Sequence, residues 1–238
     1  MKLIVRTVAG SKLYGLSHPD SDSDVRGVYV DPTDSLIGLA PPAQSMELSG
    51  PGDEQLYPLK HFAHLSLSGN PNALEILFTP HEFVIESSAD WAQLFVIRYC
   101  FLSKKLIERY TGFMRHQVTR IKTRNPGTTH QKFIDAYGYD TKSAAHCIRV
   151  GLTAMSLARS MDYSPVLEGK DLTLIKDILH GQVSQEKFNT LAKSMIDEIR
   201  AVPTPLPDEP NSATVTEVVT DILFRNVRND MVYAIKTL

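Results

Sequence analysis

Two aspartates separated by one residue, Asp22 and Asp24, are the clearest sign of chemistry in this chain. They precede an apolar run, Val28-Tyr29-Val30, and alternate side chains on a strand point to the same face. Two neighbouring carboxylates repel each other unless a cation lies between them. Oxygen ligands suit a hard divalent ion, so the pair predicts a metal site for Mg²⁺, with Mn²⁺ as the alternative ion.

A glycine-serine turn, Gly10-Ser11, follows the apolar run Leu3-Ile4-Val5. A glycine lacks the Cβ that would block a close approach, and the backbone N–H groups of such a turn can bind phosphate. Lys12 is either a further phosphate contact or a solvated surface lysine. Arg26 has three interpretations: an ion pair with Asp24, a phosphate contact, or a structural ion pair elsewhere.

The polar segment 17–24 is also typical of an ordinary turn, because Ser, Pro and Asp all favour turns. The glycine-serine pair before it and the apolar run after it favour the phosphate-handling metal site. An ordinary turn does not require all three features at this spacing.

Three groups of residues resemble the DNA polymerase beta-type nucleotidyltransferase superfamily. The first is Gly10-Ser11 with Tyr14-Gly15 and Ser21-Asp22-Ser23-Asp24-Val25-Arg26-Gly27. The second and third resemble its bacterial and phage branch of predicted nucleotidyltransferases, some associated with RNA repair. They are Gly69-Asn70-Pro71-Asn72-Ala73-Leu74-Glu75, and Tyr139-Asp140-Thr141-Lys142 with His146 and Arg149. The likeness runs from about residue 3 to about residue 200.

The resemblance implies transfer of a nucleoside monophosphate from a triphosphate to a hydroxyl group, with pyrophosphate leaving. Two metal ions can clamp the attacking and leaving oxygens of such a reaction, and they need a third acid. The resemblance places that acid at Asp53, and Glu54 is the alternative. Consecutive strand residues face opposite sides, so only one of the two can point at the metals. Asp53 can also be a simple loop-end carboxylate after Gly50-Pro51-Gly52.

Lys142, His146 and Arg149 are spaced i, i+4 and i+7, which places them on one stripe of a helix. We expect Lys142 and Arg149 to contact the triphosphate and His146 to hydrogen-bond a base or phosphate. A water-exposed helix face is the alternative. An aspartate near the metal, not His146, is the expected proton acceptor. Asn70, Asn72 and Glu75 are expected to form a helix cap and a first-turn interaction, and their match to the branch motif leaves open a part in shaping the cleft.

The net charge of −2 is unevenly distributed. Residues 98–149 hold eleven Lys or Arg against three acids, a net charge of +8, so the remainder of the chain carries −10. A basic block beside an acidic metal site suits a polyanionic partner such as a nucleotide or RNA. A solvated helix surface is the alternative.

The sequence predicts an α/β, or α+β, fold class. A small mixed nucleotidyltransferase sheet with flanking helices occupies residues 1–87, and a helical domain occupies residues 88–238. Residues 32–52 are expected to form a loop that contains one short strand, and Arg124–Gly127 a turn. The expected strands are 2–8, 24–30, 44–48, 53–58 and 83–85, and the expected helices include 59–67, 141–161, 172–179, 184–199 and 213–236.

No run of about 18 apolar residues occurs, and the N-terminus resembles a first strand more than a signal peptide. The two cysteines, Cys100 and Cys147, are expected to be reduced thiols in a cytoplasmic protein. The expected function is a metal-dependent nucleotidyltransferase that uses a nucleoside triphosphate and acts on a hydroxyl acceptor such as an RNA end. The alternative is a catalytically silent nucleotide- or RNA-binding module of the same fold.

Overall fold

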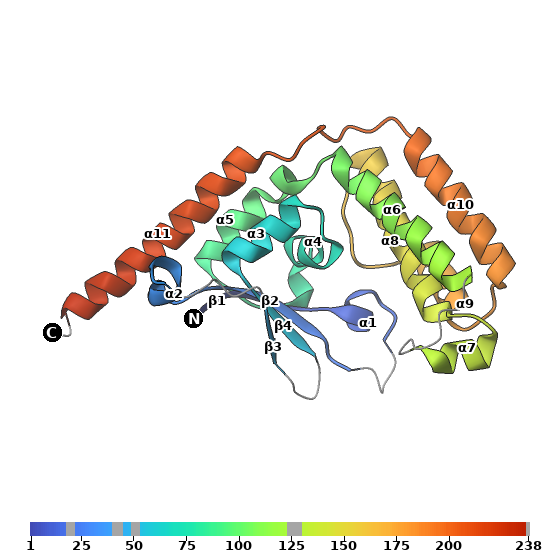
Figure 1. Cartoon of the computed structure of the whole chain (residues 1–238), viewed down its shortest axis with the longest axis horizontal. Coiled ribbons are helices and arrows are strands. Elements are labelled where there is room, and N and C mark those ends of the chain that lie inside the picture. Colours follow the sequence, from blue (N-terminus) through green and yellow to red (C-terminus); the bar gives the residue numbers. More distant parts are fainter. Residues whose placement is uncertain (18–21, 40–44, 49–52, 123–129, 237–238) are drawn as a thin grey trace. The chain divides into compact units, whose positions relative to one another are not determined.

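The computed structural model describes residues 1–17, 22–39, 45–48, 53–122 and 130–236 (Figure 1). The expected turn at Arg124–Gly127 lies outside these residues. The chain forms two compact units: a sheet unit, Met1–Leu102 with Pro210–Leu238, and a helical unit, Ser103–Glu209. This grouping differs from the division expected near residue 88, because residues 88–102 and the last helix belong with the sheet.

The sheet unit is built on five strands in the order β3-β4-β2-β1-β5, and it is a mixed sheet. Strand β2 pairs in parallel with β4, whereas the β1–β2, β1–β5 and β3–β4 pairs are antiparallel. The predicted strands are therefore present. Their bounds are β1 (Lys2–Val8), β2 (Val25–Val30), β3 (Met46–Leu48), β4 (Glu54–Pro58) and β5 (Val84–Ser87).

Helices pack on one face of this sheet (Figure 1). Helix α4 is N-capped by Asn70, whose side chain accepts from the backbone N–H groups of Asn72 and Ala73 at 2.9 and 3.3 Å. The predicted cap is thus present. The helices and 3₁₀ turns of the unit are α1 (Gly10–Leu13), α2 (Thr33–Ile37), α3 (Leu59–Leu67), α4 (Pro71–Leu77), η1 (His81–Phe83), α5 (Ala89–Val96), η2 (Arg98–Phe101) and α11 (Ser212–Lys236).

Helix α2 corrects the expectation that residues 32–52 form only a loop and one short strand. Pro32 precedes the helix, and its carbonyl accepts from Ser35 and Leu36 at 3.0 and 3.1 Å. The segment is one short helical turn with no buried side chain. It therefore has no hydrophobic periodicity from which the helix could be predicted.

Buried Asp90 explains why the last helix belongs with the sheet. Its carboxylate accepts from Lys2 of β1 at 2.9 Å and from Asn226 of α11 at 3.2 Å, and Arg225 pairs with it at 3.2 Å. Burial raises the pKa of Asp90, but these donors and positive charges outweigh it and leave the pKa lowered. The Asp90 carboxylate thus connects α5 to the first strand, β1, and to the last helix, α11.

The helical unit contains α6 (Lys104–Lys122), α7 (Gln131–Tyr137), α8 (Thr141–Ser160), α9 (Gly169–Leu179) and α10 (Gln185–Ala201). Helices α6, α9 and α10 pack on α8, whose inner face is small and apolar, with Ala144, Cys147, Ile148 and Ala154 fully buried. Burial raises the pKa of the Cys147 thiol to about 12, so this thiol is unreactive near neutral pH. Among the described helices, none has the length and apolar character needed to span a membrane.

Asp140 caps the amino end of α8. Its carboxylate accepts from the Ser143 backbone N–H at 2.9 Å and from the Ser143 hydroxyl at 2.6 Å, and His130 Nδ1 lies 3.2 Å from both oxygens. Burial raises the pKa of Asp140, but these contacts outweigh it, and the pKa is lowered. The cap is therefore strongest with the carboxylate ionised.

An Asp140→Asn substitution should reduce the acid sensitivity of the fold. A lowered folded-state pKa contributes stability that is present above about pH 4 and is lost as the pH falls through the folded value. Asparagine still caps a helix, so we expect a loss near neutral pH of only about 1 kcal/mol. Urea unfolding from about pH 7 to about pH 3 should show a shallower decline for the variant than for the wild type. Parallel declines would contradict the assignment.

Candidate active site

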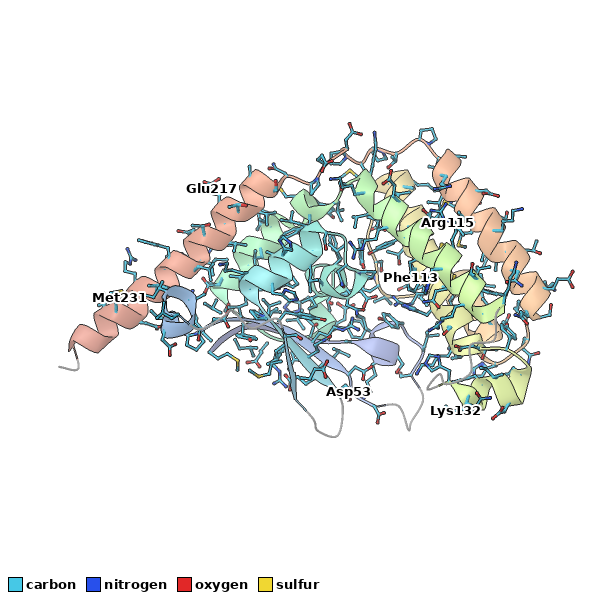
Figure 2. The ribbon with its side chains drawn as sticks, viewed as in Figure 1. Asp53, Phe113, Arg115, Lys132, Glu217 and Met231 are labelled. Atoms are coloured by element: carbon cyan, nitrogen blue, oxygen red, sulfur yellow. The ribbon has the colours of Figure 1, made fainter. Side chains whose placement is uncertain are left out.

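The candidate site lies where β1 ends and β2 and β4 begin. The Ala9 backbone N–H donates to the Asp24 carbonyl at 2.9 Å, and the Val25 N–H donates to the Asp53 carbonyl at 2.9 Å. Val25 is the register partner of Glu54, so the preceding residues, Asp24 and Asp53, also lie side by side. Figure 2 shows Asp53 at this end of the sheet. The parallel pairing of β2 and β4 thus brings together two aspartates that are 29 positions apart in sequence.

Gly10 lies directly against the Asp24 carboxylate. Its φ angle is +63°, a left-handed conformation that favours glycine, and a Cβ built on it would lie 1.9 Å from Asp24 Oδ2. A side chain at position 10 would therefore displace the carboxylate. The glycine of the Gly10-Ser11 turn leaves room for Asp24.

Glu54 is the first residue of β4, and its contacts with Arg6 place its side chain on one face of the sheet; Asp53 directly precedes it, so an extended backbone directs the Asp53 side chain to the other face. Glu54 Oε1 and Oε2 accept from Arg6 Nε and Nη2 at 2.8 and 3.1 Å, and Arg6 also pairs with Glu86 at 3.3 Å. A Cβ on Gly27 would meet Leu56 and Arg6, which places these residues on the Glu54 face. Asp24 and Asp53 each come one residue before a residue whose side chain lies on this face. Because side chains alternate along an extended chain, both aspartates share the other face.

A cleft of about 340 Å³ opens at these strand ends. Carboxylates dominate its walls, and among the described residues that line it Arg26 is the one cationic side chain. Glu47 of β3, which is the register partner of Gln55, adds a carboxylate that sequence reasoning missed because a three-residue strand carries almost no pattern. The polar lining residues are Asp24, Arg26, Glu47, Asp53, Glu54 and Gln55.

Asp22 precedes β2, so strand pairing does not fix its side chain as it fixes the position of Asp24. It is exposed, and the neighbouring Ser23 hydroxyl accepts a hydrogen bond from Lys12 Nζ. Lys12 therefore lies against the aspartate segment. Among the described residues, no three His, Cys, Asp or Glu side chains are gathered closely enough to hold one metal ion.

Arg26 pairs with Glu75 of α4. Its Nη1 donates to Glu75 Oε2 at 2.8 Å, so the structure shows the ion-pair interpretation, with Glu75 as the partner in place of Asp24. Burial lowers the pKa of Arg26, but the Glu75 charge outweighs it and the pKa is raised. Glu75 also accepts from the Tyr14 hydroxyl at 2.8 Å. The expected first-turn role of Glu75 is wrong, because the side chain reaches away from its own helix to β2 and to the end of α1.

A family model described as the RNA repair pathway DNA polymerase beta family (RlaP) matches residues 1–193. The chain belongs to this family. It is also 34% identical over 131 residues to an uncharacterized 38.9 kDa protein in the nrdC-mobD intergenic region of Enterobacteria phage T4. That match covers 50% of this chain and 39% of the phage protein.

Family membership confirms the resemblance read from the sequence and gives the chain a polymerase beta-like nucleotidyltransferase background. The mixed sheet with flanking helices agrees with the expected fold class. The matched span includes the Gly10-Ser11 turn, the aspartates and the stripe of α8.

The three residues of the α8 stripe differ in exposure. Lys142 is exposed, His146 is half-buried and Arg149 is buried. His146 Nδ1 lies 3.1 Å from Arg149 Nη2, and its ring meets the Phe113 ring edge-on at a centroid distance of 5.2 Å. Because arginine can only donate, His146 Nδ1 is the acceptor in this pair. The simple alternative of a water-exposed stripe therefore applies only to Lys142.

Proposed function

We propose that this protein is a metal-dependent nucleotidyltransferase that moves a nucleoside monophosphate from a nucleoside triphosphate to a hydroxyl acceptor, with release of pyrophosphate. The observation that supports it most is the pairing of Asp24 with Asp53 at the cleft, beside the bare backbone of Gly10. Two adjacent carboxylates on one face favour a bound cation.

The residues present fit a hard divalent ion. Their donor atoms are carboxylate oxygens, and Gly10 leaves room beside the Asp24 carboxylate. Asp24 and Asp53 would hold Mg²⁺ or Mn²⁺; the resemblance adds Asp22, which is exposed and, among the described residues, does not form a three-ligand cluster with them in this structure. The ion would supply charge neutralisation for the phosphoryl oxygens and a lowered pKa for the attacking hydroxyl. Ser11 and the backbone at Gly10 bind the β- and γ-phosphates, and Lys12 adds a positive charge nearby. An aspartate takes the proton.

Incubation with each labelled nucleoside triphosphate, Mg²⁺ or Mn²⁺, and a mixed RNA pool tests this function directly. We expect label to appear on the RNA with wild-type protein and not with the Asp24→Asn variant. Label on a small molecule or on the protein would still support a nucleotidyltransferase, but with an acceptor other than RNA. Triphosphate binding with no transfer under any condition would instead support the silent binding module.

Exposed cations at one end of the helical unit support RNA as the acceptor. Helix α6 ends there, α7 lies beside it (Figure 2), and the contacts of His130 and Arg120 with Asp140 and Ser143 bring α8 to the same end. Lys104, Lys105 and Arg159 of this unit pair with carboxylates. Within the described chain, no ion pair involves Lys122, Lys132 or Lys142 at this end, nor the exposed Lys170 and Lys187 of α9 and α10. Unpaired cations on one surface suit a phosphate backbone.

A Lys122→Gln plus Lys132→Gln variant should bind single-stranded RNA more weakly and with a reduced salt dependence. Removal of one cation that binds a phosphate lowers the slope of log K against log salt by about 0.7 for a single strand, so we expect a change of about 1.4 for the two. Fluorescence anisotropy over a salt series measures it. Lys170→Gln plus Lys187→Gln, exposed on α9 and α10, is the matched control. Equal slopes for both variants and the wild type would contradict the binding of RNA at this surface.

Lys142 is expected from the sequence to contact the triphosphate, so a Lys142→Ala substitution should weaken binding of a nucleoside triphosphate by about fivefold, which is the effect of removing an exposed charge that contributes about 1 kcal/mol. Calorimetric titration with a non-hydrolysable triphosphate measures this change. Lys142 is the better test of the stripe than Arg149, since Arg149 is buried and its loss would also disturb packing. Lys170→Ala is the control. Equal affinity for the wild type and Lys142→Ala would contradict a role of the stripe in binding the triphosphate.

A further inference from the structure

A buried carboxylate, Glu75, joins two separate parts of the candidate site. Its side chain is 3% exposed, and one oxygen, Oε2, accepts both from Arg26 Nη1 and from the Tyr14 hydroxyl at 2.8 Å. Arg26 lies on β2 two residues after Asp24. Tyr14 is the C-cap residue of α1, the short helix that begins at Gly10. Strand β2 and helix α1 therefore share one anchor on α4.

A buried carboxylate is costly unless it is paired and hydrogen-bonded, and an apolar side chain of similar volume would often be at least as stable. Stability alone is thus a weak reason for this ion pair. Arg26 also lines the cleft and keeps 19% of its side chain exposed. A guanidinium that is held at one nitrogen by a carboxylate presents its other N–H groups in a fixed direction.

The strand register indicates where Arg26 acts. Arg26 is the register partner of Gln55, and both follow the aspartate of their strand by two residues, so they share the Asp24 and Asp53 face. Arg26 therefore lies one row further along the sheet from the paired aspartates. A cation in that row can meet an anionic group of a substrate bound at the aspartates.

We propose that Glu75 is a positioning residue, which holds Arg26 toward the anionic part of the substrate and fixes α1 beside the aspartates through Tyr14. This inference rests on the proposed function for the identity of the substrate. It assigns to the Asn-Pro-Asn-x-Leu-Glu segment a role beyond capping α4: the segment ends in the anchor of the site.

Three variants separate positioning from simple structural support. Glu75→Gln removes the charge, Tyr14→Phe releases only α1, and the double variant Arg26→Met plus Glu75→Leu replaces the pair with apolar side chains. Asp90→Asn is the control, since Asp90 is also a buried, ion-paired carboxylate of the sheet unit and contacts Lys2, at the opposite end of β1.

The first readout is affinity for a non-hydrolysable nucleoside triphosphate with Mg²⁺, measured well below each variant's unfolding midpoint. We expect a loss of about tenfold for Glu75→Gln and about threefold for Tyr14→Phe, and a change within about twofold for Asp90→Asn. The double variant should regain thermal stability relative to Glu75→Gln without regaining affinity. Recovery of affinity together with stability, or unchanged affinity in Glu75→Gln, would overturn the proposal.

The second readout is amide hydrogen exchange, which requires no substrate. Glu75→Gln and Tyr14→Phe should accelerate exchange in residues 10–16, and Asp90→Asn should not. If wild-type protein binds no triphosphate, the proposed function fails while the exchange rates still test the anchoring of α1. Unchanged exchange in both Glu75→Gln and Tyr14→Phe would overturn that anchoring.

Discussion

An Asp24→Asn substitution is expected to reduce nucleotide transfer by about a thousandfold, equal to about 4 kcal/mol of transition-state stabilisation. The Asp24 side chain lies in the cleft against Gly10 and beside Asp53, so it is the best placed of the three acids to bind a metal ion. Asparagine keeps the shape but removes the charge that neutralises the ion. The rate of label transfer under saturating triphosphate and metal measures the effect.

The fold should survive this substitution. The backbone carbonyl of Asp24, which accepts from the Ala9 N–H, is unchanged, and loss of one of two adjacent negative charges relieves repulsion. We therefore expect a thermal midpoint equal to or above that of the wild type. Full activity in a stably folded Asp24→Asn protein would remove the metal-site argument, and a lowered midpoint would show that Asp24 is mainly structural.

The sequence predicted the sheet and the position of the acids because both depend on local patterns. Apolar runs bounded by turn residues marked β1 and β2, and the paired aspartates stood directly before β2. The parallel pairing of β2 with β4 was not readable from any local pattern, yet it is this pairing that sets Asp53 beside Asp24. Sequence reasoning could state that only one of Asp53 and Glu54 faces the metal, but not which.

Two features could not be predicted from the sequence because they depend on long-range contacts. Glu75 is expected from the sequence to act as a first-turn acid, but it is the fifth residue of α4, and only the packing of α4 on the sheet shows that it reaches Arg26. The last helix looks like part of a continuous helical domain, but Asp90 and its contacts with Lys2 and Asn226 join it to the sheet unit. Neither contact leaves a signal at short sequence spacing.

Family membership indicates the type of reaction more closely than it indicates the substrate. The matched family gives a polymerase beta-like background over most of the chain, and the phage relative shares only part of its length with this chain. The proposed roles of the cleft, the glycine and the paired aspartates concern the triphosphate and not the acceptor. The acceptor depends on other surfaces, and the unpaired cations of the helical unit make RNA the first acceptor to test.

An Asp53→Asn and Glu54→Gln comparison should separate catalysis from structure at adjacent positions. Asp53 shares the Asp24 face, so Asp53→Asn should lower the transfer rate by about a hundredfold, equal to about 2.7 kcal/mol, with little change in thermal midpoint. Glu54 faces Arg6 in a partly exposed bidentate pair, so Glu54→Gln should cost about 1 kcal/mol of folding stability and change the rate by less than about threefold.

The strand geometry makes these two outcomes exclusive. Asp53 directly precedes Glu54, the first residue of β4, so in an extended backbone the two side chains cannot both face the Asp24 side, and the Arg6 contact assigns Glu54 to the other side. Kinetics and thermal unfolding of the two variants, measured side by side, therefore decide the third acid. If Glu54→Gln abolishes transfer and Asp53→Asn retains it, the register argument fails and the metal site must include the face that carries Arg6. If both variants remain active, the third acid lies elsewhere in the cleft, and Glu47 is the next carboxylate to replace.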